Sequence, residues 1–188
     1  MNKPKRVLLY GFGPYRQFRD NITARIIRSL PRQAGLKKIV FPVRFHRRQF
    51  VEALERFKPD VVVGLGQSSR QRIEVESQAV NRWRARRQDN PKLIFMGGPG
   101  RLETTLRLKF GNHVGKSASA GDYVCNFSMY VMLDHIRRSD PDIPYGFVHI
   151  PHDWNEKEAS GLVQRILRRC QRCAGTRDRR AAVIGKTG

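Results

Sequence analysis

The sequence predicts an α/β fold in which helices cover both faces of a largely parallel sheet. Short apolar runs rich in β-branched residues, such as residues 61–65, alternate with segments whose apolar residues recur at helical spacing. Parallel strands need long crossover connections, which are usually helices. A chain that opens β-α-β-α-β therefore places its helices on the two faces of one sheet.

The elements follow from these periodicities and from the residues that end them. The first strand is ended by Gly11 and by Gly13-Pro14, and the helix after it has Asp20 or Asn21 as its cap and Pro31 as its stop. The expected strands cover residues 6–12, 38–45, 61–65, 72–80, 92–96 and 145–150. The expected helices cover residues 21–30, 46–57, 123–136 and 156–169.

Length and charge bound the class of protein. The chain has 188 residues, with 37 Lys and Arg against 16 Asp and Glu and a net charge of +21. This length suits one domain, which we place at residues 1–169, followed by a loosely ordered basic tail at residues 170–188. The charge predicts non-specific binding of polyanions such as nucleic acid at low salt. Because the arginines are spread along the chain, a solvated basic surface is the simpler interpretation.

Two further features bear on location and chemistry. No apolar run approaches the ~18 residues of a membrane span, and the one after Arg6 is too short for a secretory signal, so we expect a cytoplasmic protein without membrane contact. The three cysteines are Cys125, Cys170 and Cys173, and an odd number argues against a disulfide framework. The pair Cys170 and Cys173 cannot complete a tetrahedral zinc site, so no metal is predicted.

Cys125 is the first candidate for chemistry. It lies in the first turn of the expected helix, after a small-residue loop that ends in Asp122, a suitable N-cap. The free amides and the dipole of a helix start favour a thiolate and can stabilise an oxyanion. Cys125 also shares a helical stripe with Met129 and Met132. From these residues alone, a nucleophile and an inert core thiol are equally good interpretations.

A base and an orienting carboxylate are also available. His149 ends the last expected strand, and site residues of such sheets gather at the carboxyl ends of the strands. A neutral imidazole there could take the thiol proton, although His152 is a nearby competitor. Glu74 and Glu76 lie on one face of their strand, and spacing does not decide which of them orients the histidine.

Four segments, taken in order, resemble the pyroglutamyl peptidase I family of cysteine peptidases. The segments are Gly11-Phe12-Gly13-Pro14-Tyr15 with Asn21, Gly64-Leu65-Gly66-Gln67 with Val75-Glu76-Ser77-Gln78-Ala79-Val80-Asn81, Ala120-Gly121-Asp122-Tyr123-Val124-Cys125-Asn126, and Phe147-Val148-His149-Ile150-Pro151. They are similar to the family's GFxPF…N, VGQ…VExxAxN, AGxxVCN and FxHxP motifs. Together they span most of the chain.

The resemblance implies a function and a site. It makes Cys125 the nucleophile, His149 its base and Glu76 the orienting carboxylate. The implied reaction removes an N-terminal pyroglutamyl residue from peptides through an acyl-enzyme, without metal or cofactor. Phe12, Tyr15 and Gln67 match the positions that surround the lactam ring. The implied fold is a three-layer α/β/α sandwich, often assembled as a homotetramer.

The chain also departs from the family pattern. Ser68-Ser69 stands where the family has a Gly-Gly pair, and a positive φ there would strain a serine. The segment from Thr104 to Ala120 is short for the helix and strand that the family places there, and residues 82–87 are unusually basic. Two alternatives follow: a related thiol hydrolase with an altered substrate, such as acidic peptides, or a nucleic-acid-binding protein on a peptidase scaffold.

Overall fold

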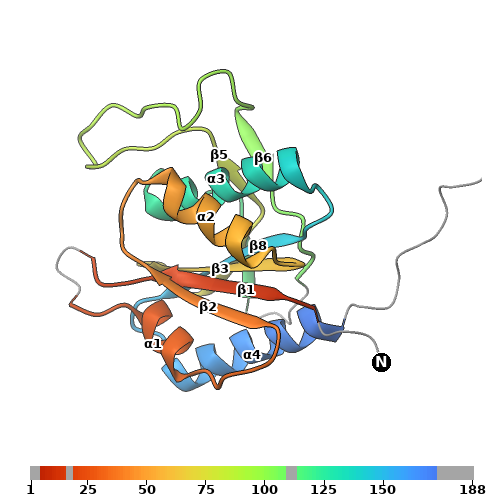
Figure 1. Cartoon of the computed structure of the whole chain (residues 1–188). Helices are drawn as coiled ribbons and strands as arrows, with labels where there is room; N and C mark the ends of the chain where they lie inside the picture. Colours follow the sequence, from red (N-terminus) through yellow and green to blue (C-terminus); the bar gives the residue numbers. More distant parts are fainter. Residues whose placement is uncertain (1–4, 16–18, 109–113, 173–188) are drawn as a thin grey trace, which may run out of the picture.

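The fold is a three-layer sandwich around one six-stranded sheet (Figure 1). The structure is a computed structural model, which describes residues 5–15, 19–108 and 114–172. The strand order is β2-β1-β3-β8-β4-β7. The strands are β1 (Val7–Phe12), β2 (Leu36–Phe41), β3 (Val61–Ser68), β4 (Ile73–Glu76), β7 (Val114–Ser117) and β8 (Tyr145–Pro151).

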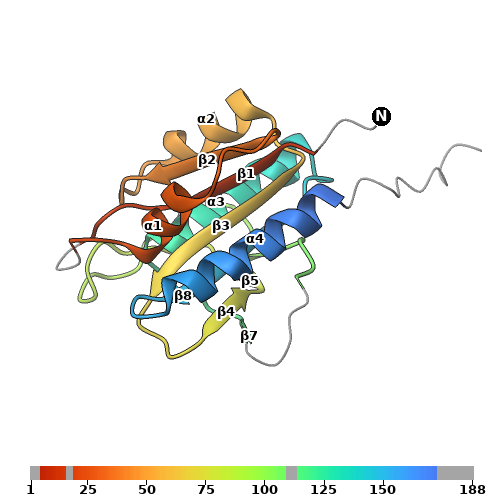
Figure 2. The same cartoon turned by 90° about the horizontal axis from the view of Figure 1, so that it is seen from below.

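The sheet is largely parallel, as the crossover argument predicts. Strands β2, β1, β3 and β8 pair in parallel, whereas β4 pairs antiparallel with β8 and parallel with β7. Helices α1 (Ile22–Ser29) and α4 (Glu156–Arg172) cover one face, and α2 (Arg47–Phe57) and α3 (Val124–Ser139) cover the other (Figures 1 and 2). The expected fold class is therefore confirmed.

Each face of the sheet has its own buried core. On the α1 and α4 side, apolar residues of alternate strand positions such as Leu9, Val63 and Val148 pack against the two helices. On the α2 and α3 side, the core is rich in aromatic rings, including Tyr10, Phe50 and Phe147. Strand residues alternate between the two cores because successive side chains of a strand point to opposite faces.

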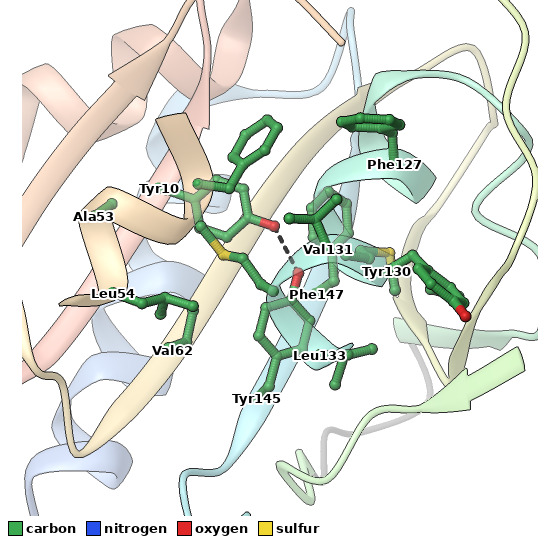
Figure 3. Packing of buried hydrophobic residues seen from close by; sticks show 14 of the residues in the cluster. Tyr10, Ala53, Leu54, Val62, Phe127, Tyr130, Val131, Leu133, Tyr145 and Phe147 are labelled. Carbon is green, nitrogen blue, oxygen red and sulfur yellow. Dashed lines mark hydrogen bonds between the residues drawn. The ribbon is translucent and has the colours of Figure 1, made fainter. Parts of the chain in front are cut away.

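A chain of buried hydroxyls ties the start of α3 to the sheet, and Figure 3 shows its first bond, between Tyr10 and Tyr145. The hydroxyl of Tyr10 lies 2.6 Å from that of Tyr145 and 3.1 Å from that of Ser128, which donates to the carbonyl of Cys125 at 2.8 Å. Each hydroxyl has one proton, so Tyr145 donates to Tyr10, Tyr10 donates to Ser128, and Ser128 donates to the Cys125 carbonyl. These bonds fix the first turn of α3 above β1 and β8.

A small second sheet lies beside α3. Strands β5 (Gln78–Val80) and β6 (Arg101–Glu103) pair antiparallel, and both contact α3 (Figure 1). The side chain of Asn126, fully buried, bonds both the amide and the carbonyl of Val80. The expected strand 72–80 is thus wrong as one strand, because its halves β4 and β5 belong to different sheets.

Several other expected elements need correction. The second strand ends at Phe41 rather than at residue 45, because Pro42 lacks the amide that would continue the ladder. The strand expected at 92–96 is absent from the described residues, where only a Trp83–Lys92 bridge forms. Instead of a strand partner, the side chain of Asn81 accepts from the amides of Ile94 and Phe95.

Two short strands were not expected from the sequence. Arg101–Glu103 and Val114–Ser117 lack the alternation of apolar and polar residues that would predict a strand. The segment between Thr104 and Ala120 therefore supplies a strand, β7, and residues 104–108 are not helical. Residues 109–113 lie outside the described part of the chain.

The last helix runs past Arg169 to Arg172, and Cys170 is buried in the core beneath α4. The tail predicted from residue 170 thus begins with the end of a helix, and residues 173–188, including Cys173, lie outside the described residues. Within the described chain, no helix combines the length and apolarity that crossing a membrane requires.

Candidate active site

The sequence-predicted site residues meet in one cavity at the carboxyl ends of β1, β3 and β8. The cavity has a volume of about 250 Å³. Its lining includes five of the six predicted residues, namely Phe12, Tyr15, Gln67, Cys125 and His149. The sixth, Glu76, lies behind His149 and is fully buried.

His149 and Glu76 form a hydrogen-bonded pair. The imidazole Nδ1 lies 2.7 Å from Glu76 Oε1, and both side chains are almost completely buried. An ionised carboxylate only accepts hydrogen bonds, so Nδ1 is the donor of this bond, and in the neutral form of the imidazole Nε2 keeps a lone pair. Glu74, the alternative carboxylate, pairs with Arg70 and Arg72 instead.

The position of the imidazole requires that residue 66 be a glycine, which has no side chain. Gly66 is the register partner of His149 in the parallel pair of β3 and β8. A Cβ on Gly66 would lie 2.7 Å from Cδ2 and 2.8 Å from Nε2 of His149. The ring therefore lies flat over the backbone of β3, in space that only glycine leaves free.

Cys125 occupies the first turn of α3, as predicted, but the cap of this helix differs from the prediction. The N-cap is Tyr123, which forms no side-chain cap bond, and Asp122 instead pairs with Arg84, whose Nε donates at 2.6 Å. Asp122 is thereby drawn away from the helix amides, because its carboxylate is the acceptor for the guanidinium. The expectation that Asp122 caps the helix was wrong.

The thiol is not preactivated in the resting structure. Burial raises the pKa of Cys125 to about 12, the charge of Glu76 adds to the rise, and Arg70 partly offsets it. A helix start contributes about 0.3–1 kcal/mol, which is less than one pKa unit and cannot reverse this. The expected lowering is therefore wrong for the resting state, and the thiol proton has to be removed during the reaction.

Glu76, by contrast, stays ionised. Burial alone would raise its pKa, but the hydrogen bond and charge of His149, the hydroxyl of Ser117 and the charge of Arg70 outweigh that effect. The pKa of Glu76 lies below its ordinary value. At neutral pH this arrangement places a neutral thiol and an imidazole backed by a carboxylate around one cavity.

The rest of the cavity lining combines aromatic and apolar side chains with a few polar ones. The tilted rings of Tyr15 and Tyr123 lie 4.8 Å apart between centroids, and Phe12, Val43 and Ala120 also line the cavity. Gln67 Oε1 accepts the Ile22 amide at 3.0 Å, which leaves the Nε2 group as the donor that Gln67 can offer a ligand. Such a lining suits a small, neutral, planar group with one or two polar atoms.

The serines that replace the family's glycines fit without backbone strain. Among the described residues, Lys58 is the only non-glycine with a positive φ, so Ser68 and Ser69 both adopt ordinary backbone conformations. Both residues line the cavity, and the carbonyl of Ser68 accepts the amide of His152 at 2.9 Å. The strain considered at these positions is absent.

Sequence reasoning gave no role in the site to Tyr123 or Arg70. Tyr123 was used as the beginning of a helix and as part of a motif, although its side chain also lines the cavity. Arg70 was given no function, yet its Nη1 lies 2.8 Å from Glu76 Oε1. Its only signal in the sequence is a basic residue in the loop before two carboxylates of one strand face. Among the described residues, no group of three or more His, Cys, Asp or Glu is arranged to hold a metal ion.

A thiol, an imidazole and a buried carboxylate around one cavity of an α/β sandwich define a cysteine hydrolase. A family model described as pyroglutamyl peptidase matches residues 5–106 and 108–157. The pyrrolidone-carboxylate peptidase of Bacillus velezensis is 33% identical, over 79% of both chains. The chain belongs to the pyroglutamyl peptidase family of cysteine peptidases.

Solved structures agree with this membership. The crystal structure of pyroglutamyl peptidase I from Bacillus amyloliquefaciens superimposes with a TM-score of 0.79 at 26% identity, covering 89% of this chain and 95% of that one. The pyrrolidone carboxyl peptidase of Thermococcus litoralis has the same fold, with a TM-score of 0.79 at 23% identity and coverage of 89% and 93%.

Proposed function

We propose that this protein removes N-terminal pyroglutamyl residues from peptides, with Cys125 as nucleophile, His149 as general base and Glu76 as the carboxylate that orients His149. The observation that carries the proposal is that Cys125 and His149 line one cavity from separate elements, while Glu76 bonds His149 from behind at 2.7 Å. The names of the relatives support the choice of substrate.

The proton movements follow from the resting state of the site. Nε2 of His149 takes the Cys125 proton as sulfur attacks the carbonyl carbon of the pyroglutamyl group, and the imidazolium that forms is stabilised by Glu76. The tetrahedral oxyanion lies near the amides of the first α3 turn. The imidazolium then protonates the departing amine, and the Cys125 thioester remains. Water, activated by the same imidazole, hydrolyses the thioester and restores the thiol.

The cavity accounts for selectivity toward the lactam. Pyroglutamate has no charged amine, so it loses little solvation energy on entering a wall made of Phe12, Tyr15 and Tyr123. The Nε2 group of Gln67 donates to the lactam carbonyl. A prolyl residue has a ring of the same size but carries a protonated amine, and no carboxylate stands among the described residues of the lining to balance that charge.

Turnover of two fluorogenic amides tests the proposal. The protein is expected to release the fluorophore from pyroglutamyl amide and not from prolyl amide, and Cys125→Ser is expected to abolish release while its melting temperature stays close to that of the wild type. A folded protein that turns over neither amide, or a Cys125→Ser variant with full activity, would contradict the proposal.

Location and assembly stay predictions. We expect a cytoplasmic protein, non-specific polyanion binding at low salt from the charge of +21, and a homo-oligomer. Light scattering across protein concentration checks the assembly.

A further inference from the structure

Arg70 connects three parts of the site with one guanidinium. Its Nη1 lies 2.8 Å from Glu76 Oε1 and also contacts Glu74 Oε2, while its Nη2 donates to the carbonyl of Ser119. Arg70 lies in the loop between β3 and β4, the two glutamates lie on β4, and Ser119 lies in the loop that leads to α3. The side chain is 32% exposed, so most of it is enclosed by these contacts.

Arg70 contacts the same carboxylate oxygen of Glu76 that His149 contacts. Oε1 of Glu76 accepts from both Arg70 Nη1 and His149 Nδ1. Two donors on one oxygen restrict rotation of the carboxylate, and a carboxylate with no exposed surface needs a nearby cation to remain charged. Glu74 is itself shared between Arg70 and Arg72, so the local charges are two cations and two carboxylates.

The contact with Ser119 reaches toward the nucleophile. Ser119 precedes Ala120, which lines the cavity together with Cys125. The positive charge of Arg70 also opposes the rise in the pKa of the Cys125 thiol. One side chain thus acts on the carboxylate, on the loop and on the field at the sulfur.

We propose that Arg70 is a positioning residue of the reaction: it keeps Glu76 ionised and aimed at His149 while it fixes the loop that leads to Cys125. This inference rests on the proposed function. Arg70 touches neither the thiol nor the imidazole, and it acts through Glu76 and through the Ser119 carbonyl.

The test compares Arg70→Gln with Arg72→Gln. Arg72 is the matched control, because it pairs with Glu74 only and is 64% exposed. Arg70→Gln is expected to lower kcat for the pyroglutamyl amide about 10- to 100-fold, the usual cost of losing a partner of a site residue, with KM changed less than about threefold. Arg72→Gln is expected to keep both constants close to those of the wild type.

The pH profile separates this role from a purely structural one. Removing a cation raises the pKa of each titrating neighbour, whether that is the Glu76 carboxyl, the His149 imidazolium or the Cys125 thiol. The acid limb of kcat/KM therefore moves to higher pH in Arg70→Gln, by about 0.5 to 1 pH unit. A loop that was merely displaced would lower kcat and leave the acid limb in place.

Arg70→Lys keeps the charge but cannot reach both Glu76 and Ser119. It is expected to show the wild-type acid limb with a kcat between those of the wild type and Arg70→Gln. If Arg70→Gln does not fold, Arg70→Lys carries the test, and a wild-type kcat in that variant would overturn the proposal. A folded Arg70→Gln variant with an unmoved acid limb would also overturn it.

A second readout keeps this result separate from the proposed function. Alkylation of Cys125 by iodoacetamide, followed by mass spectrometry of its peptide, needs no turnover. Its pH dependence is expected to shift upward in Arg70→Gln and not in Arg72→Gln. If the wild type turns over no pyroglutamyl amide, the proposed function fails, and the alkylation shift still decides whether Arg70 acts on the site.

Discussion

The inner wall of the site and the loop beyond β5 are built in different ways. In the inner wall, Glu76, His149 and Gly66 lie on adjacent strands, the two side chains bond each other, and a side chain at Gly66 would meet the His149 ring. In the outer loop, residues 81–100 contain no strand, and one side chain, that of Asn81, bonds backbone groups of Ile94, Phe95 and Gly98. The comparison indicates that the chemistry depends on strand register, whereas the loop can change without moving the reacting groups.

The largest expected difference in kcat is between variants of the two neighbouring carboxylates, Glu76 and Glu74. Glu76→Gln is expected to lower kcat about 10²- to 10⁴-fold, because the amide cannot stabilise the imidazolium that forms when Cys125 loses its proton. Glu74→Gln, two residues away on the same strand face, is expected to lower kcat less than about fivefold, because the Glu74 carboxylate pairs with Arg70 and Arg72 and not with His149. Steady-state kinetics on the pyroglutamyl amide measure both, and equal losses would contradict the assignment.

Two glycine substitutions compare the regions directly. Gly66→Ala places a methyl group 2.7 Å from the His149 ring, so the imidazole has to shift, and kcat should fall about 10- to 100-fold with a stability loss of about 1–3 kcal/mol. Gly100→Ala, at the end of the outer loop, meets no atom within 4 Å and should change neither. Kinetics together with thermal melts check the pair, and a fully active Gly66→Ala variant would show that the ring is not held by β3.

The sequence predicted most of the inner wall and little of the outer loop. The spacing of apolar residues in the sequence predicts the buried strands and the amphipathic helices, which is why β1, β3, α2 and α3 lie where expected. The rule that parallel strands end at one edge pointed to His149, whereas the choice of Cys125 as nucleophile and of Glu76 over Glu74 came from the resemblance to the family. Long-range polar contacts have no local signal, so the Arg70–Glu76 bond, the Arg84–Asp122 pair and the loop organised by Asn81 could not be predicted.

The pKa of the thiol is the clearest case of a local rule overridden by its surroundings. A helix start favours a thiolate, but burial of Cys125 disfavours the charged thiolate by more than the helix start stabilises it. The pKa of the thiol therefore rises to about 12. Besides burial, that balance depends on the charges of Glu76 on β4 and of Arg70 in the β3–β4 loop. None of them is near Cys125 in the sequence.

The smallest expected effect concerns the basic loop. Residues 82–87 are tied to the start of α3 by the Arg84–Asp122 pair and by the bond from Asn126 to the carbonyl of Arg82 at 2.8 Å. Arg86 and Arg87 are exposed there. Peptides with glutamate after the pyroglutamyl residue should therefore be cleaved about two- to fivefold faster than those with lysine at low salt.

The double variant Arg86→Gln/Arg87→Gln checks that effect. It is expected to reduce the preference for glutamate over lysine and to leave the neutral pyroglutamyl amide unaffected. Added salt should have the same result, since exposed charges are screened beyond about 10 Å at 0.1 M. A preference that survives both changes would have to come from the cavity itself.

The most direct test of the central claim is detection of the acyl-enzyme. The protein is mixed with a pyroglutamyl ester, quenched in acid within one turnover, digested and examined by mass spectrometry. The account predicts one pyroglutamyl group on the peptide that contains Cys125. Turnover without any label on Cys125, or a label on another residue, would contradict it.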